Sequence, residues 1–254
     1  MLSNATLEKM LALRLPALAE AFQDQLRRPD LAELDFAQRV GLMVDAEWTA
    51  RQQRQQRRRL KAARLRHQAC LEDVDWAAPR GLDRSVILSL GTCAFVADRR
   101  NLLVTGATGV GKSFLACAFA ERACRSGYSA FYVRAPQLYH DLAVARADGS
   151  YGRLLSKLTR TDLLVIDDWG LAPLKEAERR DLLEVVEDRH QRASTLVTSQ
   201  LPVKAWYDAI GEPTLADAIC DRLIPAAYKI DLKGKSMRDP AGRAPAARSA
   251  PRRE

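Results

Sequence analysis

Apolar residues recur at two different periods along the chain, and the change of period divides it. Up to about residue 70 they follow helical spacing, which predicts one helical segment over 3–28 and a second from about residue 35 to residue 70. Pro16 is expected to split the first segment into two pieces. We therefore expect residues 1–75 to form a small all-α domain.

From Asn101 onward, short apolar runs alternate with longer amphipathic segments. The runs predict strands over 102–105, 129–133, 162–167, 195–199 and 228–232, and the segments between them predict helices. Such alternation is typical of a parallel sheet with crossover helices. The predicted fold class is α/β, with a three-layer core and a five-stranded parallel sheet over residues 76–234. Residues 235–254 have no periodicity, and we expect a basic, disordered tail there.

The composition indicates the cellular compartment of the protein. No apolar run is long enough to cross a bilayer, and the N-terminus lacks the charged and apolar regions of a signal peptide. The five cysteines are scattered and odd in number, which favours reduced thiols over a disulfide framework or a zinc site. We expect a cytoplasmic protein with no membrane partner.

The net charge of +8 is concentrated in two segments. Residues 51–66 hold eight Lys and Arg residues and no acid, and residues 233–254 carry a net +5, so the rest of the chain carries −5. A charge run is often only the solvated face of a packed helix. Because like charges repel along a helix, this run instead favours contact with a phosphate backbone. The candidate DNA contacts here are Arg51, Arg54, Arg57, Arg58, Arg59, Lys61 and Arg64.

One stretch carries a complete phosphate-binding motif. An apolar run at Leu102–Val104 leads into the sequence GATGVGKS and then into a helical segment, which is the strand–loop–helix context that the motif requires. Lys112 is expected to reach the β- and γ-phosphates of ATP, and the Ser113 hydroxyl to bind Mg²⁺. Contacts with the nucleotide are expected from Gly106, Ala107, Thr108, Gly109, Val110, Gly111, Lys112, Ser113 and Phe114.

A second motif, LLVIDDWG, places two carboxylates at the end of an apolar strand. At the carboxyl end of a parallel strand, Asp167 would lie beside the phosphate loop and bind Mg²⁺. Asp168 would then be the base that orients the attacking water. Paired carboxylates at this position can also cap the following turn, and the spacing alone leaves that alternative open.

Two further polar residues extend the predicted site. Gln200 follows the fourth strand, which we expect to lie between the strands that carry the loop and the carboxylates, and its side chain could bind the γ-phosphate or the water. Arg222 is a candidate arginine finger, offered to the nucleotide of a neighbouring subunit. An ordinary salt bridge with Asp217 or Asp221 is the alternative for Arg222.

Together with LADAICDRL and the segment LKGKSMR, these motifs resemble the IstB-like ATP-binding proteins of insertion sequences. The resemblance implies an AAA+ ATPase, related to DnaC-type helicase loaders, that assembles with further copies of itself on duplex DNA through ATP-bridged interfaces. It also implies recruitment and stimulation of a cognate transposase. In this family pattern, Lys112 and Ser113 match Walker A, Asp167 matches Walker B, Gln200 falls at sensor 1 and Arg222 at the arginine finger.

The chain departs from the general AAA+ pattern in two ways. Asp168 stands where a catalytic glutamate is usual, which implies slow hydrolysis, and too few residues follow the fifth strand for a separate lid domain. In related initiators the insert after the second strand touches DNA, so Arg153 and Lys157 are further DNA-contact candidates. The alternatives are a replicative helicase loader and an ATP-switched DNA-binding adaptor with little hydrolysis. A small-molecule kinase would leave the basic segments unexplained.

Overall fold

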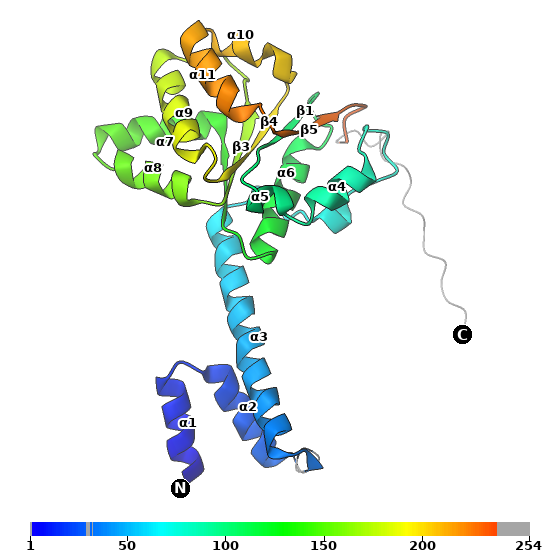
Figure 1. Ribbon diagram of the computed structural model, residues 1–254, viewed down its shortest axis with the longest axis vertical. Coiled ribbons are helices and arrows are strands. Elements are labelled where there is room, and N and C mark those ends of the chain that lie inside the picture. Colours follow the sequence, from blue (N-terminus) through cyan, green and yellow to red (C-terminus); the bar gives the residue numbers. More distant parts are fainter. Residues whose placement is uncertain (1, 29–30, 32, 238–254) are drawn as a thin grey trace. The chain divides into compact units, whose positions relative to one another are not determined.

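A computed structural model describes residues 2–28, 31 and 33–237 of the chain (Figure 1). The chain divides into two units, Met1–Arg58 and Arg59–Glu254. Each unit is considered by itself below.

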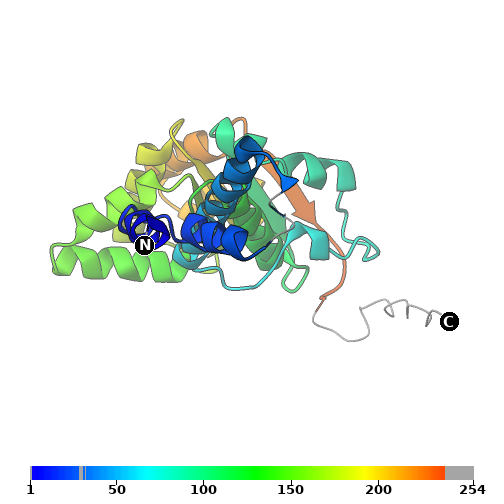
Figure 2. The same ribbon diagram turned by 90° about the horizontal axis from the view of Figure 1, so that it is seen from below.

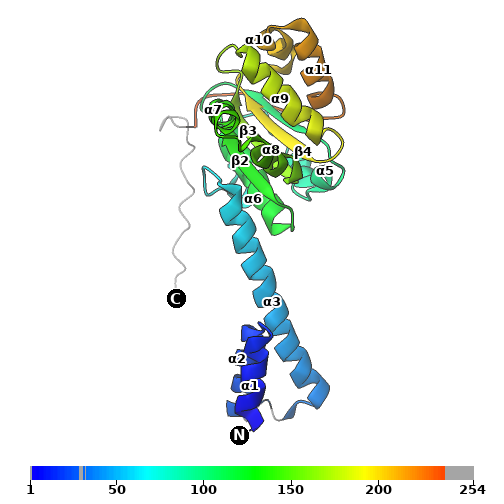
Figure 3. The same ribbon diagram turned by 90° about the vertical axis from the view of Figure 1, so that its left-hand side faces the viewer.

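The second unit is built on the five-stranded parallel sheet that the alternating pattern predicts. Its strands lie in the order β2-β3-β4-β1-β5, so β2 forms one edge (Figure 3) and β5 the other (Figure 2). All four strand pairs are parallel. The strands are β1 (Leu102–Gly106), β2 (Ala130–Arg134), β3 (Leu163–Trp169), β4 (Ser194–Ser199) and β5 (Tyr228–Leu232).

Helices cover both faces of this sheet, as a three-layer α/β fold requires (Figure 1). Alternate strand residues point to opposite faces, so Leu102 and Val104 join one core cluster while Leu103 joins the other. The first cluster packs against α4 (Arg84–Leu90), α5 (Ala94–Ala97) and α6 (Lys112–Arg125). The second packs against α7 (Ala135–Ala147), α8 (Tyr151–Arg160), α9 (Glu176–Arg189), α10 (Trp206–Ile210) and α11 (Pro213–Leu223). Two short 3₁₀ helices, η2 (Leu71–Asp73) and η3 (Val203–Ala205), complete this unit.

The end of the basic run and the residues that follow it pack with this sheet. Arg59, in the last turns of α3 (Phe36–Ala63), donates a hydrogen bond to the carbonyl of Cys124 at 3.0 Å. Ala63, Ala69 and Leu71 are buried in the first core cluster. A boundary for independent folding near residue 75 stays a prediction. Most of the predicted tail, residues 238–254, lies outside the described residues.

The first unit contains the predicted N-terminal helices. Pro16 divides the first segment, because it begins α2 (Pro16–Arg27) after α1 (Leu2–Ala12), and proline is tolerated in the first turn of a helix. Glu47 of α3 is buried, and its Oε2 accepts hydrogen bonds from the amides of Ala17 at 3.0 Å and Leu18 at 3.3 Å. A carboxylate from α3 therefore caps the N-terminus of α2.

Two further expectations concern the chain as a whole. All five cysteines are unpaired thiols. Among the described residues, no helix combines the length and the apolar character that a membrane span needs.

Candidate nucleotide site

The phosphate loop connects β1 to α6 at the carboxyl edge of the sheet. Lys112 opens the helix and is only 7% exposed. Its Nζ donates hydrogen bonds to the carbonyls of Gly106 and Ala107, both at 2.7 Å, so the ammonium lies inside the curl of the loop. Backbone amides and a helix N-terminus converge on the same space, which makes the loop suited to bind phosphate.

Asp167 lies at the centre of a group of hydroxyls beside this loop. It is fully buried, and Oδ1 accepts a hydrogen bond from the Ser113 hydroxyl at 3.0 Å and another from Thr198. Oδ2 accepts from the phenol of Tyr132. Burial and the neighbouring Asp167 carboxylate both raise the pKa of Tyr132, so the phenol stays protonated and remains a donor.

These oxygens fit a hard divalent cation. Mg²⁺ prefers carboxylate and hydroxyl oxygens together with water and substrate phosphates. The Asp167 carboxylate and the Ser113 hydroxyl supply the first two and lie within hydrogen-bond distance of each other. The structure thus brings Lys112, Ser113 and Asp167 to one place, and the roles expected of them there stay predictions.

Asp168 is held in a different way from Asp167. Its backbone has a positive φ of 58°, and its amide donates to Thr198 Oγ1 at 3.1 Å. Its Oδ2 accepts a hydrogen bond from Arg134 Nε at 2.9 Å, and Arg66 Nη1 lies 3.8 Å from the same oxygen. Arg66 Nη1 is also 4.0 Å from Asp167 Oδ2. The candidate base is therefore paired with one arginine and close to a second.

The end of β4 lies between the loop strand and the carboxylate strand, as predicted. Ser199 is buried and has a structural role, because its hydroxyl donates to the Trp169 carbonyl at 2.8 Å and accepts from the Leu201 amide at 3.0 Å. Gln200 follows it and is exposed. Of these two residues, Gln200 is the one whose side chain is available to a ligand.

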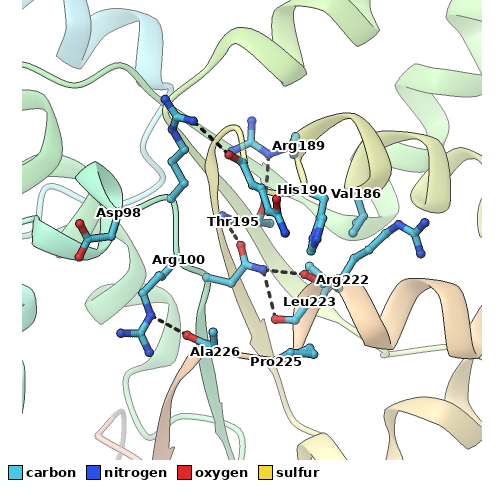
Figure 4. A pocket seen from close by; sticks show the side chains of 13 residues that line it. Asp98, Arg100, Val186, Arg189, His190, Thr195, Arg222, Leu223, Pro225 and Ala226 are labelled. Carbon is cyan, nitrogen blue, oxygen red and sulfur yellow. Dashed lines mark hydrogen bonds between the residues drawn. The ribbon is translucent and has the colours of Figure 1, made fainter.

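Arg222 lies near the amino ends of the strands, opposite the carboxyl ends where the phosphate loop lies. It is at the end of α11, and its Nε forms an ion pair with Glu187, while Nη1 donates to the Ala218 carbonyl at 2.9 Å. Neither Asp217 nor Asp221 is this partner. Arg222 lines a cavity of about 300 Å³ at the amino ends of β1 and β4 (Figure 4). The Asn101 side chain anchors the end of α11 there through the carbonyls of Arg222 at 3.1 Å and Leu223 at 3.2 Å.

Comparison with known proteins places this geometry in a family. The sequence profile of IstB-like ATP binding proteins matches residues 8–243. The chain belongs to the IstB-like ATP binding protein family. An insertion sequence ATP-binding protein of Sinorhizobium fredii is 47% identical over 238 residues, which cover 94% of this chain and 97% of that protein. The IS21 ATP-binding protein of Pseudomonas aeruginosa is 30% identical over 226 residues, covering 89% and 85% of the two chains.

Solved structures support the fold of this IstB-like chain. The crystal structure of DnaI has a TM-score of 0.57 at 23% identity and matches 70% of this chain and 94% of DnaI. The replication initiator DnaA, solved with AMPPCP and single-stranded DNA, has a TM-score of 0.54 at 14% identity, over 68% and 52% of the two chains. The second unit therefore has the AAA+ P-loop fold.

The candidate DNA contacts of this IstB-like chain differ in how they are held. In the first unit, Arg54 Nη2 lies 2.8 Å and Arg51 Nη2 3.5 Å from Glu47 Oε1, so both help to neutralise a buried carboxylate. In the second unit, Lys157 Nζ lies 3.8 Å and the Arg64 guanidinium 5.8 Å from the centre of the Phe131 ring. Four further candidates have exposed side chains, namely Arg57, Arg58, Lys61 and Arg153.

Several site residues were not predicted. Tyr132, Thr198 and Arg134 reach the carboxylates because β2 and β4 flank β3. Strand order is not written in the local sequence, although Thr198 immediately precedes the predicted Ser199–Gln200 pair. Arg66 was expected only as part of the basic run.

Proposed function

We propose that this chain is an ATP-dependent, DNA-binding AAA+ ATPase that assembles on target DNA and recruits and stimulates a transposase. One observation carries the ATPase part of this proposal, namely the convergence of Lys112, Ser113 and buried Asp167 at the carboxyl edge of the sheet. Membership of an insertion-sequence ATP-binding family supports the transposition part.

Each residue has a defined task in this proposal. Lys112 would transfer its hydrogen bonds from the loop carbonyls to the β- and γ-phosphates. Ser113 and Asp167 would hold Mg²⁺, whose charge would stabilise the leaving phosphates. Asp168 would accept a proton from the attacking water, and exposed Gln200 would orient that water or the γ-phosphate.

DNA binding and assembly rest on charge and on the position of Arg222. The exposed arginines of the basic run can contact phosphates without reading sequence. DnaA was solved with AMPPCP and single-stranded DNA, and its ATPase fold resembles that of this chain. Because Arg222 lies at the amino edge and the phosphate loop at the carboxyl edge, Arg222 would serve the nucleotide of a neighbouring copy.

A direct experiment compares ATP turnover and sedimentation with and without duplex DNA. We expect DNA to stimulate turnover and ATP to produce a large complex with DNA at moderate salt. A protein that stays monomeric and does not bind DNA, whether or not ATP is present, would contradict the proposal.

The ion pair at Asp168 favours a second candidate, an ATP-switched DNA-binding adaptor with little hydrolysis. Arg134 Nε occupies one oxygen of the Asp168 carboxylate at 2.9 Å, which leaves that oxygen unavailable to an attacking water. ATP-dependent DNA binding without measurable turnover would favour the adaptor. If turnover is present and Asp168→Asn abolishes it, the ATPase proposal stands and Asp168 is its base.

A further inference from the structure

Arg80 is a buried cation beside the phosphate loop. It comes from the segment before α4, and it is 6% exposed. Its Nη2 donates to the carbonyl of Asp75 at 2.7 Å, and its Nη1 donates to the carbonyl of Val110 at 3.3 Å. Within the described part of the chain, its Nε has no hydrogen-bond partner and no carboxylate forms an ion pair with it.

Such a charge is costly in the absence of an anion. Burial lowers the pKa of Arg80, and the charge of Asp75 offsets this only in part. A guanidinium keeps its proton even so, and a buried charge without a counter-charge destabilises a fold. The nearest place where a strong anion is expected is the phosphate loop itself, so nucleotide phosphates would supply the missing counter-charge.

The hydrogen bond to Val110 also has a directional consequence. In a trans peptide the C=O and the following N–H point in opposite directions. When Arg80 holds the Val110 carbonyl on its own side, the Gly111 N–H points away from Arg80. A positive charge on the carbonyl side also polarises this amide and strengthens it as a donor.

Gly111 makes this approach possible. A Cβ at residue 111 would lie 2.7 Å from Arg80 Nη1, so a side chain there would collide with the guanidinium. Residue 111 has φ 100°, a left-handed conformation that glycine adopts without strain. The backbone of Arg80 is fixed as well, because its carbonyl accepts a hydrogen bond from the Lys233 amide at 2.9 Å.

We propose that Arg80 is a positioning residue of the phosphate loop, which orients the Val110–Gly111 peptide so that its N–H receives the β-phosphate of a nucleoside di- or triphosphate. Arg80 makes its contact with the loop and not with the ligand, and its charge acts on the phosphates across the Val110–Gly111 peptide. This inference rests on the nucleotide binding within the proposed function and is independent of DNA assembly and of hydrolysis.

The test uses Arg80→Met in the full chain and compares the affinities of ADP and AMP by competition against a fluorescent ADP. AMP lacks the β-phosphate, so the ratio of the ADP and AMP affinities reports how much the contact between the loop and the β-phosphate contributes to binding. We expect the ADP affinity to fall about tenfold and the AMP affinity to change less than about twofold, since the lost contact is a charge-assisted one. Thermal unfolding without nucleotide is expected to be unchanged or to occur at a higher temperature, since an uncompensated buried charge is removed.

Two variants complete the test. Arg84→Met is the matched control, because Arg84 is an exposed arginine in the same stretch and its removal should leave both affinities unchanged. Arg80→Lys keeps the charge but has one ammonium in place of the two groups that bind the Val110 and Asp75 carbonyls, so we expect its ADP affinity to fall about threefold and its AMP affinity to stay unchanged. It also decides the question if Arg80→Met fails to fold.

An unchanged ADP affinity in Arg80→Met, or an equal loss for ADP and AMP in either variant, would overturn the proposal. A wild-type chain that binds no ADP would instead refute nucleotide binding itself, and with it the proposed function.

Discussion

At the scale of single residues, the prediction about the rate of ATP hydrolysis depends on Asp168, the proposed base. Its Oδ2 accepts a hydrogen bond from Arg134 Nε at 2.9 Å, so one carboxylate oxygen is already occupied. A base in this state is available for water only after Arg134 moves or is neutralised. The resting chain is therefore expected to turn over ATP slowly.

Replacing Arg134 tests this explanation. Arg134→Gln is expected to raise turnover without DNA by about threefold or more, because the Asp168 carboxylate is released to act as a base. Steady-state phosphate release measures the effect, with Arg153→Gln as a control that removes an exposed arginine elsewhere. A drop in turnover in Arg134→Gln would show that the pair holds Asp168 in its working position.

The same site shows which residue contacts could be predicted from the sequence and which could not. Lys112, Ser113 and Asp167 belong to motifs in which spacing fixes geometry, so their meeting at one edge could be predicted. The contacts from neighbouring strands depend on tertiary packing, and the role of Arg66 depends on where the chain turns after α3. The sequence showed the residue types but not which residues distant in the chain come together in the fold.

At the scale of elements, a carboxylate in α3 stabilises the start of α2. Burial alone would raise the pKa of Glu47, but hydrogen bonds from Leu18, Arg54 and Ala17 outweigh it and lower the pKa below 4.5. A lowered pKa means that the ionised form is stabilised by folding. The contribution is complete above pH 4.5 and is lost as the pH falls through the lower, folded-state pKa.

Glu47→Gln should remove both the stability and its pH dependence. We expect a loss of about 1–2 kcal/mol near pH 7, because a helix cap and its charge are weakened. Below about pH 4 the difference between wild type and variant should shrink. Thermal unfolding followed by circular dichroism from about pH 7 to about pH 3 measures this, and the exposed Asp45→Asn on the same helix is the control. A difference that stays constant with pH would contradict the assignment.

The segment after β5 is a second element with a testable role. Met237 donates its amide to the Gly109 carbonyl at 2.9 Å, so the chain crosses the phosphate loop there. A Cβ on residue 109 would lie 2.1 Å from Ser236 Oγ and 3.2 Å from Ser236 Cα. The loop and this segment can approach so closely only because residue 109 is glycine.

Gly109→Ala is expected to displace residues 233–237 and to speed tryptic cleavage after Lys233 and Lys235, because their side chains are already exposed and backbone hydrogen bonds hold the segment in place. Gly127→Ala is the matched control, because Gly127 also has a positive φ, of 99°, but a Cβ added there would have nothing within 4 Å. Both variants carry the same kind of backbone strain, and only the first carries the collision. Mass spectrometry of timed digests measures cleavage at the two lysines, and equal rates in both variants would exclude the contact.

Elements were easier to predict than their contacts. The alternation of periods predicted all five strands, with ends that differ by at most two residues, because buried parallel strands are short apolar runs between turn residues. The second N-terminal helix was predicted to continue to about residue 70, but α3 ends at Ala63. Arg64 has a positive φ of 52°, which ends the helix, and an arginine gives no sequence signal for that conformation.

At the scale of the whole molecule, the separation of Arg222 from the phosphate loop decides whether this arginine can act on the nucleotide of its own chain. The arginine lies near the amino edge of the sheet and the loop at the carboxyl edge, and a five-residue strand such as β1 spans about 15 Å between them. Arg222 therefore cannot reach the nucleotide of its own chain without rearrangement. In an assembly with head-to-tail contacts, it would face the nucleotide of the next copy.

Mixing two inactive variants distinguishes these arrangements. Arg222→Ala keeps an intact loop and Lys112→Ala keeps an intact arginine, so each alone should lose DNA-stimulated turnover. In a random mixture, about one quarter of head-to-tail interfaces join the intact loop of one variant to the intact arginine of the other. We therefore expect equal mixing to restore about a quarter of wild-type turnover, whereas an arginine that acts within its own chain would restore none. In the single chain, Arg222 forms an ion pair with Glu187. If Arg222 acts on the next copy, adding Glu187→Gln to both variants should leave the turnover of the mixture unchanged, which shows that the ion pair is not needed for this activity.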